Sequence, residues 1–152
     1  MKVRTFKDLL VWKKAHALVL EVYKATQAFP KEEQFGLVAQ IRRSASSIPT
    51  NIVEGQKRNS TKDCLHFLNM SDASLEETKY LLILSRDLSY LDGEASERIS
   101  ILCDEVGRLL SALQRSRRRD LQRPHGIVTF AFQNGDTMVT KNFELLKGSL
   151  PS

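Results

Sequence analysis

The chain has 152 residues, of which 41% are hydrophobic and 27% are charged. This length and composition are typical of one globular domain with a buried core. No run approaches the ~20 apolar residues of a membrane helix, so a membrane-spanning protein is excluded. The net charge of +5 is compatible with an acidic partner, either nucleic acid or an acidic protein face.

The charge is unevenly distributed along the chain. Residues 1–59 carry 11 Lys/Arg against 5 Asp/Glu, residues 60–114 carry 5 against 10, and residues 115–152 carry 7 against 3. An acidic middle between basic flanks suits subunits that pack basic face against acidic face. It equally suits nucleic-acid binding.

Cellular location is indicated by the cysteines and the first residues. Cys64 and Cys103 have no CxxC spacing and are expected to be buried thiols in a reducing compartment. Mixed polar sequence follows residues 1–4, which predicts no signal peptide. A cytoplasmic location is therefore expected.

The first helix is predicted over residues 5–29, and Pro30 ends it. Thr5 and Asp8 have the spacing of a capping box at its start. Apolar residues recur in steps of three and four, as a bundle helix requires. This stripe consists of Val11, Ala15, Leu18, Val22, Ala25 and Phe29.

The second helix is predicted to begin within residues 32–35 and to close over residues 55–59. Its apolar stripe passes straight through Pro49. A proline inside a helix removes one hydrogen bond and crowds the carbonyl of Ala45, so a kink is expected rather than an end. The stripe consists of Val38, Ile41, Ala45, Ile48 and Ile52.

The third helix is predicted over residues 60–90. One stripe on it comprises Cys64, Leu68, Ser71, Leu75, Thr78 and Leu82. The run over residues 81–84 is apolar on every side, which predicts either deep burial or a subunit interface at Leu81, Ile83 and Leu84.

The fourth helix is predicted over residues 94–118, with acidic residues at its start and arginines at its end, as the helix dipole favours. Its stripe comprises Ile99, Leu102, Val106, Leu109 and Leu113. Four amphipathic helices with short connections predict an all-α fold. The expected architecture is an antiparallel up-down four-helix bundle over residues 1–119 with a kinked second helix.

Residues 120–152 are predicted to be a C-terminal extension. β-prone runs at residues 127–132 and 137–140 flank Asn134-Gly135, which is typical of a β-hairpin. Residues 143–147 could form one helical turn. The alternative is an extension that is disordered or that binds a neighbour.

Catalytic and metal-binding patterns are weak in this sequence. A di-metal bundle needs Glu-x-x-His pairs, and no Glu lies three residues before His16, His66 or His125. Cys64 and His66 are two residues apart and point to opposite faces of a helix. The glycines form no phosphate-binding loop. The sequence therefore predicts no catalytic residues, no metal, no cofactor and no enzyme.

Basic residues are the strongest candidates for a binding role, because guanidinium groups match phosphate oxygens bidentately. The alternative for Arg42 and Arg43 is pairing with the acidic third and fourth helices, within or between subunits. Without interleaved aromatic residues, binding would follow the backbone and shape of a nucleic acid. The candidates are Lys13, Lys14, Arg42, Arg43, Lys57, Arg58, Arg115, Arg117, Arg118, Arg119 and Arg123.

Residues 40–58 carry a resemblance to a known family. The pattern comprises Ile41-Arg42-Arg43, Ser47, Ile48, Pro49, Asn51, Ile52, Glu54 and Gly55. The flanks agree at residues 10–15, 22–23, 29–30, 33, 35–37, 67–68, 74–75 and 77. The chain resembles, over residues 4–114, the four-helix-bundle proteins encoded in intervening sequences of bacterial large-subunit ribosomal RNA genes.

This resemblance implies a left-handed antiparallel bundle, commonly a homopentamer around a central pore, with no established enzymatic activity. The accessory variability determinant of diversity-generating retroelements is similar in fold. That relative is a basic pentamer that binds nucleic acid and a reverse transcriptase. The residues after 120 are outside the family pattern, so the resemblance implies nothing about them.

Two functional hypotheses follow. The first is a non-enzymatic homo-oligomer that binds nucleic acid, RNA in preference to DNA, through its basic surface, with a reverse-transcriptase accessory role as one specific form. The second is a structural module that assembles with proteins and binds no nucleic acid.

Overall fold

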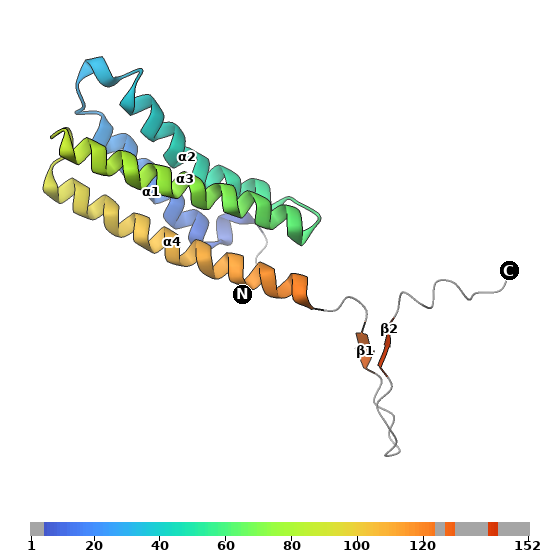
Figure 1. Cartoon of the computed structure of the whole chain (residues 1–152). Helices are drawn as coiled ribbons and strands as arrows, with labels where there is room; N and C mark the ends of the chain where they lie inside the picture. Colours follow the sequence, from blue (N-terminus) through green and yellow to red (C-terminus); the bar gives the residue numbers. More distant parts are fainter. Residues whose placement is uncertain (1–4, 124–126, 130–139, 143–152) are drawn as a thin grey trace.

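A computed structural model describes residues 5–123, 127–129 and 140–142 of the chain. Four α-helices follow one another: α1 (Leu10–Thr26), α2 (Leu37–Gln56), α3 (Thr61–Asp87) and α4 (Gly93–Gln122). Helices α1 and α3 each pack against both α2 and α4. Consecutive helices run in opposite directions (Figure 1). The predicted antiparallel up-down four-helix bundle is confirmed.

The first predicted helix is divided in two by the structure. The capping box of Thr5 and Asp8 is present, but it closes only a short 3-10 helix, η1 (Phe6–Asp8). Leu9 has an extended backbone (φ −73°, ψ 124°), and α1 begins after it. The helix also ends before Pro30, at Thr26, whose hydroxyl donates to the Val22 carbonyl (2.8 Å).

Helix α2 is continuous through Pro49, as its apolar stripe predicts. It begins later than expected, at Leu37, after a second 3-10 helix, η2 (Lys31–Glu33). Side chains near the proline donate to carbonyls one turn back: Thr50 Oγ1 to Ser46 (2.8 Å) and Asn51 Nδ2 to Ser47 (2.9 Å). These bonds reinforce the part of the helix where Pro49 cannot donate. Every residue of the predicted stripe is buried.

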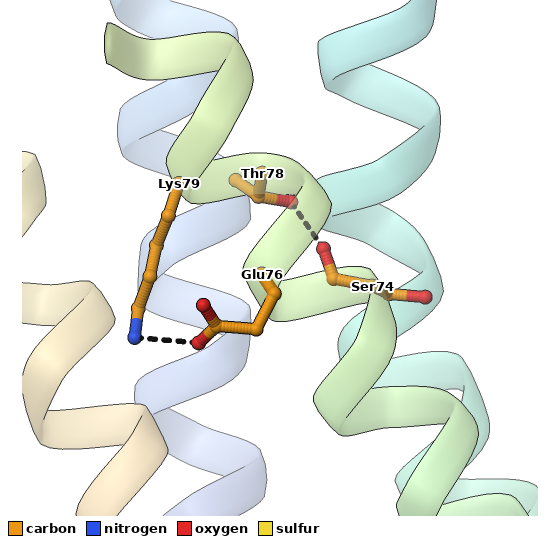
Figure 2. Close-up of polar contacts among 4 residues, drawn as sticks. All are labelled: Ser74, Glu76, Thr78 and Lys79. Atoms are coloured by element: carbon orange, nitrogen blue, oxygen red, sulfur yellow. Dashed lines mark hydrogen bonds and ion pairs between the residues drawn. The ribbon is translucent and has the colours of Figure 1, made fainter.

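Small hydroxylated residues line the contact between α2 and α3. Ser71 Oγ donates to the Ile48 carbonyl (2.9 Å), and Thr78 Oγ1 lies 3.0 Å from Ser44 Oγ. Figure 2 shows the Thr78 hydroxyl directed back to the Ser74 carbonyl, at 2.8 Å. Because Ser44, Ser71 and Thr78 are all buried, these bonds satisfy polar groups that water cannot reach.

Gly55 lies where α2 closely approaches α3. A Cβ atom at this position would lie 3.2 Å from the Cys64 carbonyl oxygen and 3.3 Å from the Phe67 Cβ. Gly107, inside α4, is different, because a Cβ there would meet Leu75 Cδ2 at 3.5 Å and Lys79 Nζ at 4.0 Å, both in ordinary contact. The packing therefore favours a residue without a Cβ atom at position 55, whereas position 107 has room for one.

The Gly55→Ala variant is expected to be less stable than the wild type. The steric cost of overpacking, about 1–3 kcal/mol, exceeds the gain of about 0.5–1 kcal/mol in helix propensity. The matched control Gly107→Ala has no such clash and should gain about 0.5–1 kcal/mol. Urea denaturation followed by circular dichroism measures both, and a stabilised Gly55→Ala variant would contradict the close approach.

Helix α3 ends at Asp87, three residues before the predicted end. Ser89 adopts a left-handed backbone (φ 61°), and the Tyr90 N–H donates to the Ser85 carbonyl (2.9 Å). These features form a C-terminal cap that stops the helix. All six residues of the stripe that starts at Cys64 are buried.

The apolar run over residues 81–84 is shared between the core and the surface. Leu81 and Leu82 are buried within the single chain, Leu84 is partly buried, and Ile83 is 49% exposed. This corrects the interface assignment for Leu81, whose side chain packs in the core of its own bundle. Ile83 and Leu84 remain the predicted interface residues of this run.

Helix α4 is longer than predicted and extends to Gln122. Asp92 caps its start by accepting from the Ala95 N–H (2.7 Å). Ile99 and Val106 are buried as predicted, whereas the other predicted core positions of α4 are only partly buried. The fully packed face also contains Cys103, Leu110 and Gln114.

The extension contains two short strands, β1 (Ile127–Thr129) and β2 (Thr140–Asn142). They pair antiparallel, with Ile127 opposite Asn142 and Thr129 opposite Thr140. This pairing matches the strand segments of the predicted hairpin in part. The predicted turn at Asn134-Gly135 and the helical turn at residues 143–147 lie outside the described residues.

Candidate nucleic-acid interface

One end of the bundle collects the α2–α3 connection, the start of α3 and the C-terminal part of α4 (Figure 1). Arg117 in α4 reaches across to α2, where its Nη2 donates to Gln56 Oε1 (3.4 Å). The up-down topology thus brings two separate basic stretches of the sequence together. We call this group of residues the basic end: Lys57, Arg58, Arg115, Arg117, Arg118, Arg119 and Arg123.

Several cations of the basic end are free to meet a ligand. Lys57, Arg115, Arg118 and Arg119 are exposed. Within the described part of the chain, their side chains make no hydrogen bond or ion pair. Three of these four side chains lie within five residues on α4, so one surface presents several guanidinium groups to solvent.

The other three cations of the basic end have partners. Arg58 pairs with Glu54 (2.6 Å) and lies over the Phe67 ring, 4.3 Å from its centroid. Arg117 and Arg123 approach Asp120 at 3.7 and 3.9 Å. The contacts to Asp120 are long, and exposed pairs of this kind contribute little to stability.

Arg42 and Arg43 lie away from the basic end, near the C-terminus of α1. Arg42 Nε donates to Thr26 Oγ1 (2.9 Å), and its guanidinium lies 4.5 Å from the centroid of the Tyr23 ring. Arg42 is thus anchored to α1, and among the described residues of the single chain it forms no ion pair with α3 or α4. Pairing of Arg42 between subunits stays a prediction. Arg43 is exposed and has no ion pair among the described residues.

The two lysines of α1 differ from each other. Lys14 forms an ion pair with Glu105 of α4 (3.0 Å), which joins the two helices. Lys13 is exposed. Lys14 therefore has a structural partner, and Lys13 is the better candidate of the two for phosphate contact.

The motif of α2 that carries the family resemblance is structural in this fold, because most of it is buried. Ile48, Pro49, Asn51 and Gly55 are all buried in the bundle. Glu54 is exposed and holds Arg58. These residues shape α2 and its contact with α3.

Both cysteines are buried free thiols, as predicted. Burial raises the pKa of Cys103 to about 12. Burial also raises the pKa of Cys64, although the neighbouring Arg117 guanidinium partly opposes that rise. Because the thiolate is the reactive form, neither cysteine is activated as a nucleophile.

A polar groove of about 590 Å³ lies between α3 and α4, and its charges are mixed. Lys79 pairs there with Glu76 (2.8 Å), on the side of α3 next to α4 (Figure 2). This hydrogen bond raises the pKa of Lys79, so the amine stays protonated. Three carboxylates, from Asp72, Glu76 and Asp104, face three cations, from Lys79, Arg108 and Arg115, so the lining of the groove carries no net charge that would attract an anion.

No group of three or more His, Cys, Asp and Glu residues in residues 5–123 could hold a metal ion. None of the helices described is long and apolar enough to cross a membrane.

Sequence reasoning did not find two features of the surface. One is an apolar groove of about 660 Å³ between α1 and α4, where Leu20 and Ile101 are more than half exposed. The other is a polar cavity at the α2–α3 connection, beside Gln56 and Arg117. Both depend on residues far apart in the chain, so no local motif signals either one.

Comparison with known proteins agrees with the architecture. No curated protein matches the chain. The fold is similar to a crystal structure of a protein of unknown function from the S23 ribosomal protein family of Bacteroides thetaiotaomicron. The TM-score is 0.65 at 27% sequence identity, and the match covers 72% of this chain and 98% of that one. The family model of the 23S rRNA-intervening sequence protein matches residues 7–112, and the chain therefore belongs to that family.

Proposed function

We propose that this protein is a non-enzymatic, homo-oligomeric bundle that binds nucleic acid, RNA in preference to DNA, through its basic end. The observation that carries the proposal is the gathering of cations from two distant stretches of sequence at one end of the fold. Four of them are exposed and without protein partners among the described residues. A surface of this kind neutralises phosphates and releases counterions.

Recognition is proposed to follow the phosphate backbone. The large exposed aromatic side chains of the described residues are Tyr23, Phe35 and Tyr80, and none belongs to the basic end. Phe67 lies there, but the Arg58 guanidinium covers its ring. Base stacking therefore contributes little, and sequence specificity should be low.

Assembly as a homo-oligomer, with five subunits as the proposed number, is supported by apolar surface that one chain leaves uncovered. Leu20 and Ile101 expose more than half of their area in the groove between α1 and α4, and Ile83 exposes 49%. The number five rests on the family resemblance. A cytoplasmic location is part of the proposal, and a reverse-transcriptase accessory role is one specific form of it.

A salt titration tests the proposal directly. Fluorescence anisotropy with a labelled single-stranded RNA should show binding at 50 mM salt that weakens steeply by 200 mM. Four phosphate contacts would give a slope of log K against log salt of about −3. An RNA affinity that does not change with salt, or no binding to mixed RNA and DNA at 50 mM salt, would contradict the nucleic-acid proposal.

A second candidate function is a protein assembly module without nucleic-acid binding. The apolar groove between α1 and α4 favours it, because Glu21, Glu94 and Glu97 surround apolar side chains in the arrangement typical of a protein interface. An oligomer in light scattering combined with no RNA binding would support this candidate.

A further inference from the structure

The α2–α3 connection and α4 enclose a polar cavity of about 240 Å³. A drug-sized ligand needs about 300 Å³ or more, whereas a single water occupies about 30 Å³ of liquid. The cavity is partly open to solvent, and its volume is large enough for one tetrahedral anion with water. Its polar lining includes Gln56, Arg58, Asn59, Ser60, Thr61 and Arg117.

The charge of the cavity wall is positive. Two lining residues, Arg58 and Arg117, carry guanidinium groups, and none of the residues that line the cavity is acidic. Neighbouring carboxylates belong to Glu54, which pairs with Arg58, and to Asp120, which lies 3.7 Å from Arg117 Nη1. Asp63, in the first turn of α3, is a third. The wall therefore favours an anion and disfavours a cation.

The Arg117 guanidinium is partly buried, yet the hydrogen bond and the ion pair that it makes are long. Its described contacts to oxygen atoms are those to Gln56 at 3.4 Å and to Asp120 at 3.7 Å. Its guanidinium also lies beside the buried Cys64 thiol, a weak acceptor. Its Nε atom is buried without an acceptor, and so is Gln56 Nε2. Buried donors without partners are rare in folded proteins because each one is costly. A small rearrangement that directs these donors to an anion would remove that cost.

The start of α3 adds backbone donors to the same cavity. Ser60 Oγ accepts from the Asp63 N–H (3.0 Å), and the Ser60 carbonyl accepts from the Cys64 N–H (3.0 Å). Within the described part of the chain, the N–H groups of Thr61 and Lys62 have no acceptor. Free N–H groups at the start of a 27-residue helix favour negative charge.

We propose that this cavity is a phosphate-binding site that receives one phosphate group of a bound nucleic acid. Arg58 and Arg117 supply the charge, and the Gln56 amide and the first turn of α3 supply neutral donors. The inference rests on the proposed nucleic-acid function only for the source of the phosphate. Inorganic phosphate, which offers the same tetrahedral oxygens, serves as the probe.

The test is an NMR titration of the ¹⁵N-labelled chain with inorganic phosphate, at an ionic strength held constant with chloride. The Thr61 and Lys62 amides, Arg117 Nε–H and the Gln56 side-chain amide should shift and saturate together. Arg117→Gln should weaken the binding roughly tenfold or more, because it removes charge-assisted hydrogen bonds. Arg108→Gln removes the same charge from α4 outside both the cavity and the basic end, and it should leave the affinity nearly unchanged.

A second variant, Arg58→Gln in the connection, keeps the test decisive if Arg117→Gln fails to fold, and it should also weaken the binding. Shifts that do not saturate, or equal losses of phosphate affinity in Arg108→Gln and the two cavity variants, would overturn the site. If RNA binds but phosphate does not saturate the shifts, the phosphate site in the cavity is refuted, whereas nucleic-acid binding by the basic end is not. Saturation by phosphate without RNA binding would support the cavity for free phosphate and refute the proposed source of the phosphate.

Discussion

Replacing Arg115, Arg118 and Arg119 together by glutamate is expected to lower the RNA affinity about 100-fold or more. A hydrogen bond to a charged group contributes about 1.5–3 kcal/mol, so losing even two phosphate contacts reaches that range. The three new carboxylates also repel the phosphates. If each arginine contacts one phosphate, the slope of log K against log salt should become less steep by the amount expected for about three phosphate contacts.

The fold should survive this triple change because the three side chains are exposed and have no ion pairs among the described residues. Glutamates near the end of α4 oppose the helix dipole, at about 0.3–1 kcal/mol for each residue in the last turn. Thermal melting followed by circular dichroism checks that the bundle remains folded. Arg117 is left unchanged in this variant because it contacts Gln56 and Asp120.

The matched control reverses three exposed cations at the other end of the bundle, in Lys24, Lys31 and Arg43. Both triple variants change the net charge equally, so a general effect of charge would lower the RNA affinity of both. We expect the control to bind RNA within a few-fold of the wild type. If the two variants lose the same affinity, binding is not localised at the basic end.

The fold could be predicted from the sequence because its main signals are local and periodic. The stripe from Val38 to Ile52 indicated a helix through Pro49, and the structure has a continuous α2 there. The ends of helices were harder to predict. The capping box at Thr5 closes a 3-10 turn, and Ser89 ends α3 through a left-handed backbone that residue type alone does not predict.

The face of α4 was predicted only in part. Leu102, Leu109 and Leu113 are more hydrophobic than Cys103 and Gln114, yet the latter two are buried. Gln114 can be buried because its Nε2 donates to Asn69 Oδ1 (3.0 Å) on α3. A hydrogen bond between residues 45 positions apart leaves no trace in local periodicity, so hydrophobicity alone selected the wrong neighbours.

The basic residues of the candidate site likewise depend on tertiary contacts that the local sequence does not reveal. Composition identified the cations, but their partners come from tertiary structure. Arg42 turned out to be bound to Thr26, sixteen residues away, and Lys14 to Glu105 on α4. Only the folded chain separates these structural cations from the exposed ones of α4.

Leu81→Ala is expected to destabilise the chain by about 2–5 kcal/mol, the range for truncating a buried leucine. Leu81 is 2% exposed within the single chain, whereas Ile83, two positions along the same helix, is 49% exposed. Ile83→Ala should therefore change the free energy of unfolding by less than about 1 kcal/mol. Urea denaturation at two protein concentrations separates folding from assembly, because only assembly depends on concentration.

The same pair of variants tests the proposed oligomer. If the face that carries Ile83 is an interface, Ile83→Ala lowers the mass measured by light scattering, while the stability of the single bundle is kept. Leu81→Ala should instead lower stability at every protein concentration, because its cavity forms inside one chain. The reverse pattern, with assembly lost in Leu81→Ala and stability unchanged, would place Leu81 at the interface and contradict the packing of α3 described above.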